Sequence, residues 1–452
     1  NINLNKMVLS DFTKLFMPKD AGISAEINGV AKIEDIFYTP SIIANVVASN
    51  VKLGEVSIGN IALQSELEQA RNRIVVNTQV QENGNDIRGY GYYSLDRSKP
   101  ELNLAFDLRK LSLDFLNYPY FKPYVKNTYG TATGKLRLQG VMPKLALTGS
   151  MKIDTAATTV SYLNTRYSIR NQEVLLTENN ININHLIIQD INNNEHNKAI
   201  ANGKIYHSWF KNFGIDLRVN TFNAMMLNTD EKLNPVFYGK AFAAGSVNFK
   251  GLFNDLTIRA NVKTMPGTHV NLPIRNTKET SRYSFFQFVD KKADSLKIEA
   301  KQKLKLNGLT FILELEATPD GRIDIVLDPV AGDILSSIGK GNIKLEIPKA
   351  GNVTMYGTYE VAKGDYLFTL QNIINKRFQI EPGGSINFTG DIYQAQLNVD
   401  AVYSVRTSTY DLISDFFEHS TTSGTSQQSE AETRARSRIP VKLLMKLSGV
   451  LA

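Results

Sequence analysis

Apolar and polar residues alternate with a period of two along most of this chain. Clear examples are the runs from Leu102 to Leu108 and from Leu309 to Leu315. A period of two places successive side chains on opposite faces of a β-strand. Each predicted strand therefore has one apolar face and one polar face. The sequence predicts an all-β protein with few helices.

Helical patterns are short and turn signals are frequent. We expect short amphipathic helices at residues 7–17, 63–72 and 408–418. Predicted turns are NGND at 83–86, TPDG at 318–321 and PGG at 382–384. Residues 420–438 are polar and of low complexity, and they are interpreted as a mobile insert.

One sequence unit recurs three times. It consists of a glycine, an alternating strand, a second glycine six residues later, a short turn and another strand. The copies begin at Gly134, Gly245 and Gly384, so they lie 111 and 139 residues apart. A Tyr-Gly pair precedes each copy. These spacings are too long for a short-period solenoid, and they favour one long sheet built from hairpins of varying length.

A sheet with one apolar face must cover that face, and this chain has hardly any helices to do so. Two arrangements remain open: a sandwich, or an elongated, curled antiparallel sheet whose concave face is apolar. A continuous lining of aliphatic and aromatic side chains suits acyl chains rather than a polar substrate. The predicted lipid-groove lining is Leu136, Leu138, Leu145, Leu147, Val247, Phe249, Leu256, Ile258, Leu313, Leu315, Ile323, Ile325, Ile343, Leu345, Ile386, Phe388, Leu397 and Val399.

The composition argues against most chemistry. The chain has no Cys, and its five His residues show no metal-ligand spacing. Carboxylates alternate on the predicted solvent face, and no catalytic fingerprint is present, so we expect no enzyme, no metal and no cofactor other than bound phospholipid or detergent. The net charge of +7 is scattered, which argues against nucleic-acid binding. No apolar run is long enough for a membrane-spanning helix. Because the chain begins in mid-pattern, we expect it to be part of a longer protein.

The C-terminal part, residues 351–412, resembles the C-terminal domain of TamB, the translocation and assembly module subunit, in its Bacteroidetes-type form. TamB is an AsmA-like protein, similar to the bridge-like lipid transfer proteins. The match is close over residues 230–412 and looser over 1–229. It predicts AsmA-like β-groove repeats at 1–229 and a TamB C-terminal-type domain at 230–452, within one continuous sheet. The residues that carry the resemblance are Gly357, Tyr359, Gly364, Tyr366, Phe368, Phe378, Gly384, Gly390, Asp391, Ala395 and Tyr403.

The resemblance implies a place in the periplasm of a Gram-negative cell envelope. It implies an inner-membrane helix outside this chain, a taco-shaped β-sheet with a lipid-filled groove, and docking of the C-terminal end on an outer-membrane barrel of the BamA/TamA superfamily. The function it predicts is a hydrophobic conduit for phospholipids between the inner and outer membranes. An outer-membrane protein assembly factor and a non-transporting envelope scaffold are the alternatives. The insert at 420–438 departs from the family pattern, so no docking residue is predicted.

Overall fold

A computed structural model shows an all-β protein, as the sequence predicts. It describes residues 2–8, 23–34, 41–96, 98–119, 121–141, 144–190, 197–209, 211–234, 237–273, 308–328, 332–350, 352–370, 374–410, 414 and 433–451. Within these residues the chain forms 24 strands that belong to one hydrogen-bonded sheet. Two compact units can be distinguished. Unit 1 comprises Asn1–Thr229, Phe242–Val262 and Leu306–Ile312, and unit 2 comprises Asp230–Ala241, Lys263–Lys305 and Leu313–Ala452.

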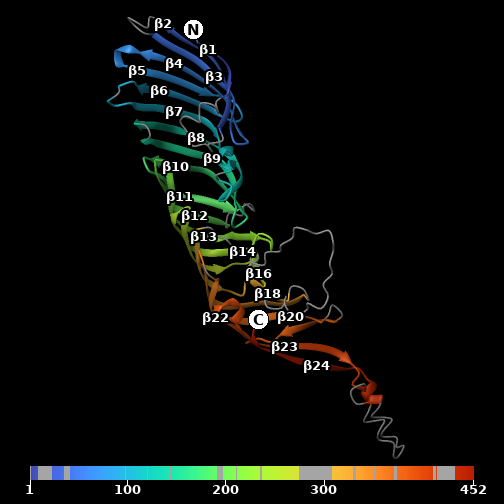
Figure 1. Cartoon of the computed structure of the whole chain (residues 1–452). Coiled ribbons are helices and arrows are strands. Elements are labelled where there is room, and N and C mark those ends of the chain that lie inside the picture. The colour runs from blue at the N-terminus through green and yellow to red at the C-terminus, as the bar shows by residue number, and fades with distance from the viewer. Residues whose placement is uncertain are drawn as a thin grey trace, which may run out of the picture. The chain divides into compact units, whose positions relative to one another are not determined.

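The first thirteen strands follow one another as an antiparallel meander in unit 1 (Figure 1). They are β1 (Ile2–Val8), β2 (Ile23–Glu34), β3 (Ser41–Leu53), β4 (Val56–Glu68), β5 (Arg73–Val80), β6 (Asp86–Ser94), β7 (Glu101–Ser112), β8 (Val125–Val141), β9 (Lys144–Val160), β10 (Thr165–Thr177), β11 (Asn180–Asp190), β12 (Lys198–Ser208) and β13 (Lys211–Thr229). Two short 3₁₀ helices, η1 (Gln69–Arg71) and η2 (Leu113–Asn117), lie between strands.

The remaining strands follow in chain order. They are β14 (Tyr238–Leu252), β15 (Asp255–Thr264), β16 (His269–Pro273), β17 (Leu309–Ala317), β18 (Arg322–Asp328), β19 (Asp333–Ile347), β20 (Thr354–Leu370), β21 (Ile374–Ile380), β22 (Ser385–Asp391), β23 (Gln396–Thr407) and β24 (Ile439–Val450). The 3₁₀ helix η4 (Ile392–Gln394) precedes β23, and residues 433–436 form a helical turn before β24.

The three predicted helices have different outcomes. Residues 63–72 were expected to be helical, but 63–68 belong to β4 and only 69–71 form a 3₁₀ turn. In β4, Leu63 pairs with Val46 and Thr78, and such cross-strand contacts outweigh the helix propensity of the Gln and Glu residues between them. Most of 7–17 and 408–418, and residues 420–432 of the insert, lie outside the described residues.

Each of the three repeat copies forms a β-hairpin or a strand–turn–strand unit, as predicted. The second glycine of the copies has nearly the same backbone conformation each time, with φ of +138° at Gly140, +129° at Gly251 and +135° at Gly390. This region of φ strongly favours glycine. A Cβ added at Gly140 would also lie 2.3 Å from the backbone oxygen of Lys144. The repeated glycine therefore sets the backbone geometry just before each turn.

Two predicted turns interrupt a strand instead of reversing the chain. TPDG lies between β17 and β18, which both pair with β19. PGG lies between β21 and β22, which are both antiparallel to β20. NGND, in contrast, joins the antiparallel neighbours β5 and β6. The sheet is also not wholly antiparallel, because β16 and β18 pair in parallel. Parallel pairing needs a connection of a dozen or more residues, and the sequence between Pro273 at the end of β16 and Arg322 at the start of β18 is longer than that.

Candidate functional site

A continuous row of paired residues crosses all thirteen strands of the unit 1 meander. Residues that pair across neighbouring strands point to the same face of a sheet. This row, which we call row A, contains no charged residue and only one polar residue, Thr78. Its members from β1 to β13 are Leu4, Gly29, Val46, Leu63, Thr78, Gly89, Phe106, Leu136, Gly149, Leu176, Ile181, Ile205 and Ile215.

Two further rows run beside row A on the same face. Row B contains Met7, Ile27, Ala48, Ile61, Val80, Ile87, Leu108, Gly134, Met151 and Val174. Row C contains Ile2, Ala31, Ala44, Ser65, Val76, Gly91, Leu104, Leu138 and Leu147. Neither row carries a charge. The three rows together define the apolar face of unit 1.

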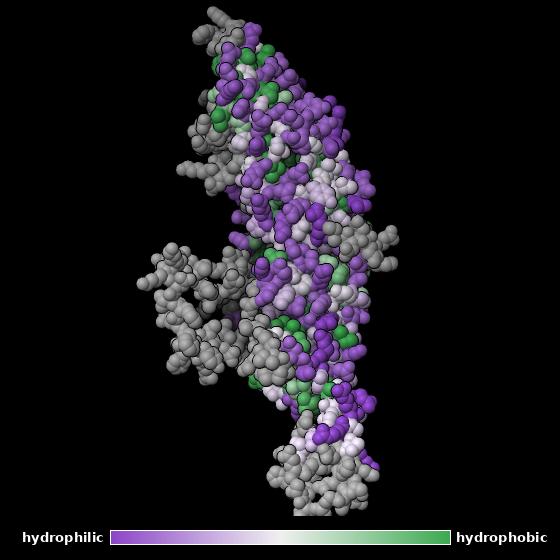
Figure 2. All heavy atoms as spheres, turned by 90° about the vertical axis from the view of Figure 1, so that its right-hand side faces the viewer, coloured by the Kyte–Doolittle hydropathy of each residue, from purple (hydrophilic) through white to green (hydrophobic). Residues whose placement is uncertain are grey.

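The apolar face is only partly covered. In row A, Gly89 and Leu176 are buried and the other members are half-buried. Three members of row B are buried, whereas row C has none, so burial deepens from row C towards row B. The opposite face carries exposed side chains such as Lys135 and Arg137. Figure 2 shows one side of the molecule, and its surface is mostly hydrophilic with scattered hydrophobic residues. A half-buried apolar face is suited to contact another apolar molecule.

β-Bulges lie near row B and bend the strands, and the one in β1 falls between Leu4 of row A and Met7 of row B. Lys6 in β1, Asn50 in β3 and His185 in β11 have left-handed backbone conformations with φ between +48° and +52°, and the strand register shifts around each of them. The backbone N–H of each donates a 2.8 Å hydrogen bond to an Asn side chain of the next strand. Those side chains belong to Asn28, Asn60 and Asn202. Bulges increase local twist and bend a strand, so this device curls the sheet.

The predicted lining residues fall into two environments. Ten are half-buried: Leu136, Leu138, Leu145, Leu147, Phe249, Leu256, Ile258, Leu313, Leu315 and Ile323. The other eight are less than 9% exposed: Val247, Ile325, Ile343, Leu345, Ile386, Phe388, Leu397 and Val399. Seven of these eight belong to unit 2, where they pack as hydrophobic core. A side chain that is fully packed by protein offers little surface to a ligand, so in unit 2 only Leu313, Leu315 and Ile323, which are half-buried, keep exposed surface among the predicted lining residues.

Four of the aromatic residues that carry the family resemblance cluster in unit 2, where Phe378 is buried at their centre. Phe378 lies 6.5 Å from both Tyr366 and Phe368 and 5.6 Å from Tyr403, measured between ring centroids. Burial and the nearby Asp333 carboxylate raise the pKa of Tyr366 to about 12. The Tyr366 hydroxyl donates to Asp333 over 3.4 Å. Tyr359 and Ala395 are also buried.

The remaining motif residues shape the backbone of unit 2. A Cβ at Gly357 would lie 2.0 Å from the Asn342 oxygen, and one at Gly364 would lie 2.3 Å from the Ser336 oxygen. Gly384 precedes β22 and Gly390 lies near its end, and the Asp391 carboxylate accepts a 3.0 Å hydrogen bond from the Tyr393 N–H. The family motif therefore specifies packing and turns, and its residues form no reactive centre.

Unit 2 also holds a buried carboxylate that the sequence analysis missed. Asp324 is 7% exposed, and its oxygens lie 2.7 Å from His269 Nε2 and 2.9 Å from Arg322 Nε. Burial favours the neutral acid, but hydrogen bonds from Arg322, His269 and Ser336 outweigh burial and lower the pKa of Asp324. The alternation pattern marks Asp324 as an ordinary polar strand position, and although Arg322 is close in sequence, His269 lies 55 residues away.

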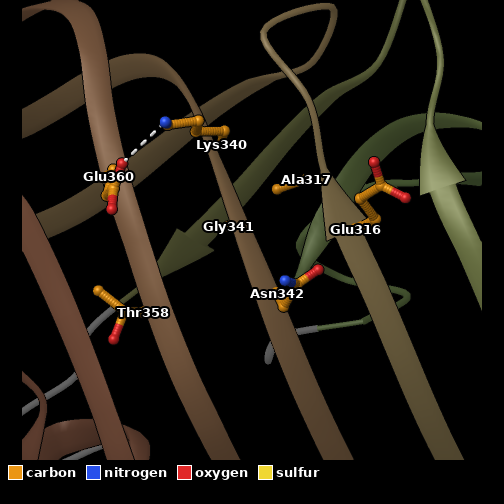
Figure 3. A pocket seen from close by; sticks show the side chains of 7 residues that line it. All are labelled: Glu316, Ala317, Lys340, Gly341, Asn342, Thr358 and Glu360. Carbon is orange, nitrogen blue, oxygen red and sulfur yellow. Dashed lines mark ion pairs between the residues drawn. The ribbon is translucent and has the colours of Figure 1, made fainter.

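A polar depression of about 690 Å³ lies on unit 2 (Figure 3). Its lining comes from β17, β19 and β20, and Lys340 forms a 3.2 Å ion pair with Glu360 across it. The lining residues are Glu316, Ala317, Lys340, Gly341, Asn342, Thr358 and Glu360. In the described part of the chain, no group of three or more His, Asp or Glu is placed to hold a metal ion. Among the same residues, no helix has the length and hydropathy needed to cross a membrane.

Taken together, these features define an all-β protein whose candidate site is an extended apolar surface. The family model for the TamB C-terminal domain matches residues 189–452, more than half of the chain, and the chain belongs to this family. The match begins within β11. Neither the search of curated proteins nor the search of solved structures returned a match.

Family membership connects the chain with the translocation and assembly module of the cell envelope. The family is a non-enzymatic component of that module, it spans the periplasm, and its partner is an outer-membrane protein of the TamA type.

Proposed function

We propose that the apolar face of unit 1 carries the acyl chains of phospholipids between the inner and outer membranes. The observation that supports this proposal is row A, which crosses thirteen strands without a charged side chain. At a strand spacing of about 4.8 Å, twelve steps give an apolar path of about 58 Å. An inner-membrane anchor outside this chain and a barrel of the BamA/TamA superfamily at the C-terminal end complete the proposed arrangement.

The energy scale favours a path of this kind. Moving an acyl chain of about 16 carbons through water costs about 12 kcal/mol, at about 0.8 kcal/mol for each CH₂ group. An apolar face removes most of this barrier. Because the rows consist almost entirely of Leu, Ile, Val, Met, Phe, Ala and Gly, no position binds an acyl chain much more tightly than the next. A lipid can therefore move along the face while its headgroup stays in water.

Site-specific photocrosslinking tests the proposal on neighbouring residues. Leu138 belongs to row C, and the next residue, Gln139, is exposed on the opposite face. A photoreactive amino acid at position 138 should form phospholipid adducts in intact cells, detected by mass spectrometry. The same group at position 139 should form few. Equal labelling at both positions, or no lipid at either, would reject the proposal.

A role in protein assembly is the second candidate, and the β24 edge favours it. Among the described residues β24 pairs only with β23, and Leu443 and Leu444 on it are 55% and 76% exposed. An edge strand can add a strand from another chain by backbone hydrogen bonding. Replacing Leu444 with Pro should reduce outer-membrane protein assembly and leave lipid labelling at position 138 intact if the two functions are separate. A protein that acts only as a scaffold would show neither lipid labelling at position 138 nor an assembly defect on replacement of Leu444.

A further inference from the structure

Four aromatic side chains form a cluster in unit 1. The rings of Tyr124 and Phe253 lie 5.1 Å apart, Phe253 stacks on Phe213 at 6.3 Å, and His207 lies 5.3 Å from Phe213, all between centroids. His207 is 7% exposed, whereas Tyr124 is 41% exposed. We call these four residues the aromatic clasp.

The members of the clasp come from opposite rims of the meander. The first rim contains the turns after β8, β10 and β12, as the pairs Val141–Lys144, Thr177–Asn180 and Ser208–Lys211 show. His207 and Phe213 flank the last of these turns. Phe253 follows β14 and donates its backbone N–H to the oxygen of Phe213 over 2.9 Å, so it lies on the first rim too.

Tyr124 lies on the second rim. It precedes Val125, which pairs with Val160 at the opposite end of β8 and β9. The backbone N–H of Ser161, in the turn after β9, donates to the Tyr124 oxygen over 2.9 Å. The contact between Tyr124 and Phe253 therefore joins the two rims.

On a flat sheet these rims would be far apart. β8 has 17 residues, which corresponds to roughly 56 Å of extended strand. Tyr124 and Phe253 can touch only because the sheet curls between β8 and β14. Rows A and B on the apolar face are buried or half-buried, whereas Lys135 and Arg137 on the polar face are exposed, so we infer that the curl encloses the apolar face. At the clasp, the seam between the rims is closed.

We propose that the aromatic clasp is a gate on lipid movement. This proposal rests on the proposed function. A phospholipid whose acyl chains follow the apolar face needs an open seam for its headgroup, and the closed clasp blocks that seam. Passage therefore requires Tyr124 to separate from Phe253. The contact is small and its tyrosine is partly exposed, so it can open without disrupting the strands.

The absence of Cys in the chain allows a direct test. In the variant Tyr124→Cys/Phe253→Cys, a short, reducible bis-maleimide joins the two cysteines. The assay then measures how fast the full chain transfers a fluorescent phospholipid between vesicles of phosphatidylethanolamine and phosphatidylglycerol. The control Arg137→Cys/Thr148→Cys joins paired residues of β8 and β9 on the polar face. Crosslinking the clasp should lower the transfer rate at least tenfold while lipid stays bound to the chain. Reductive cleavage of the crosslinker should restore the transfer rate. The locked control should transfer normally.

Three outcomes separate the possibilities. Unchanged transfer by the fully locked clasp would overturn the gate and leave the conduit standing. Failure of the unlocked chain to bind or transfer lipid would overturn the conduit and the gate together. Tyr124→Ala gives an independent measurement: a gate predicts transfer that is faster by about two- to tenfold, the range expected from loss of one aromatic pair. Tyr124→Phe should behave as the natural chain. If the aromatic clasp has only a structural role, Tyr124→Ala should transfer lipid more slowly than the natural chain.

Discussion

A strip of carboxylates across the apolar face should stop lipid transfer. Leu104, Leu138 and Leu147 pair with one another across β7, β8 and β9 in row C. Replacing all three with Glu places a polar strip about 14 Å long in the path, at about 4.8 Å per strand. If about five methylene groups of a passing chain face carboxylates instead of leucines, the loss is about 4 kcal/mol. Since about 1.4 kcal/mol corresponds to a tenfold change in rate, transfer should fall several hundredfold.

A matched variant separates this effect from damage to the fold. Ala105, Arg137 and Thr148 pair in the same way on the same three strands, but on the opposite face. Their triple replacement with Glu creates similar like-charge repulsion between neighbouring strands without touching the apolar path. Both variants are assayed for vesicle-to-vesicle transfer and for thermal unfolding. Equal transfer rates in the two variants, with both folded, would refute the conduit.

The structure makes three further predictions about the fold. Gly140→Ala should lower the melting temperature more than Gly390→Ala, because a Cβ would lie 2.3 Å from a backbone oxygen at Gly140 but no closer than 3.8 Å to any atom at Gly390. Asn202→Ala removes the acceptor for the His185 N–H, so it should lower the free energy of unfolding in urea titrations by about 1 kcal/mol. His185→Gly should instead raise the free energy of unfolding by about 1 kcal/mol, because glycine adopts φ of +52° without strain. Burial lowers the pKa of His207, so the unfolded chain binds its proton first and stability should fall as pH drops below about 6.5. His207→Phe should flatten the dependence of stability on pH below about 6.5. An unchanged slope in this variant would show that His207 does not cause the loss of stability.

The sequence predicts the strands and their faces well because both depend on local alternation. Leu136, Leu138, Leu145 and Leu147 share one face for this reason. The three repeat glycines before the turns are also local, because only glycine readily adopts their φ. Residues 63–72 show the limit of local reasoning: Leu, Gln and Glu favour a helix, and the neighbouring strands decide otherwise.

Long-range features lie beyond such reasoning. Tyr124 and Phe253 meet only through the curl of the sheet, and neither the identity nor the spacing of these residues signals the contact. Bulges such as those at Lys6 and His185 bend the strands, and residue type alone does not mark them, because lysine rarely adopts a left-handed conformation whereas histidine is enriched there. What stabilises each bulge is an Asn side chain on the next strand, so the signal is a pairing rather than a motif.

The division of residues between the two units explains why the family motif and the candidate site differ. A buried core such as that around Phe378 tolerates few substitutions, because volume and shape must fit, so it leaves a recognisable sequence signature. A surface over which acyl chains move needs only apolar side chains in register, and Leu, Ile, Val or Met satisfies that need equally well. Row A accordingly contains no motif, although it is the longest continuous apolar feature among the described residues of unit 1. The proposed function would therefore be encoded in strand register and in the absence of charge along a row, features that become visible only when residues distant in sequence are placed side by side.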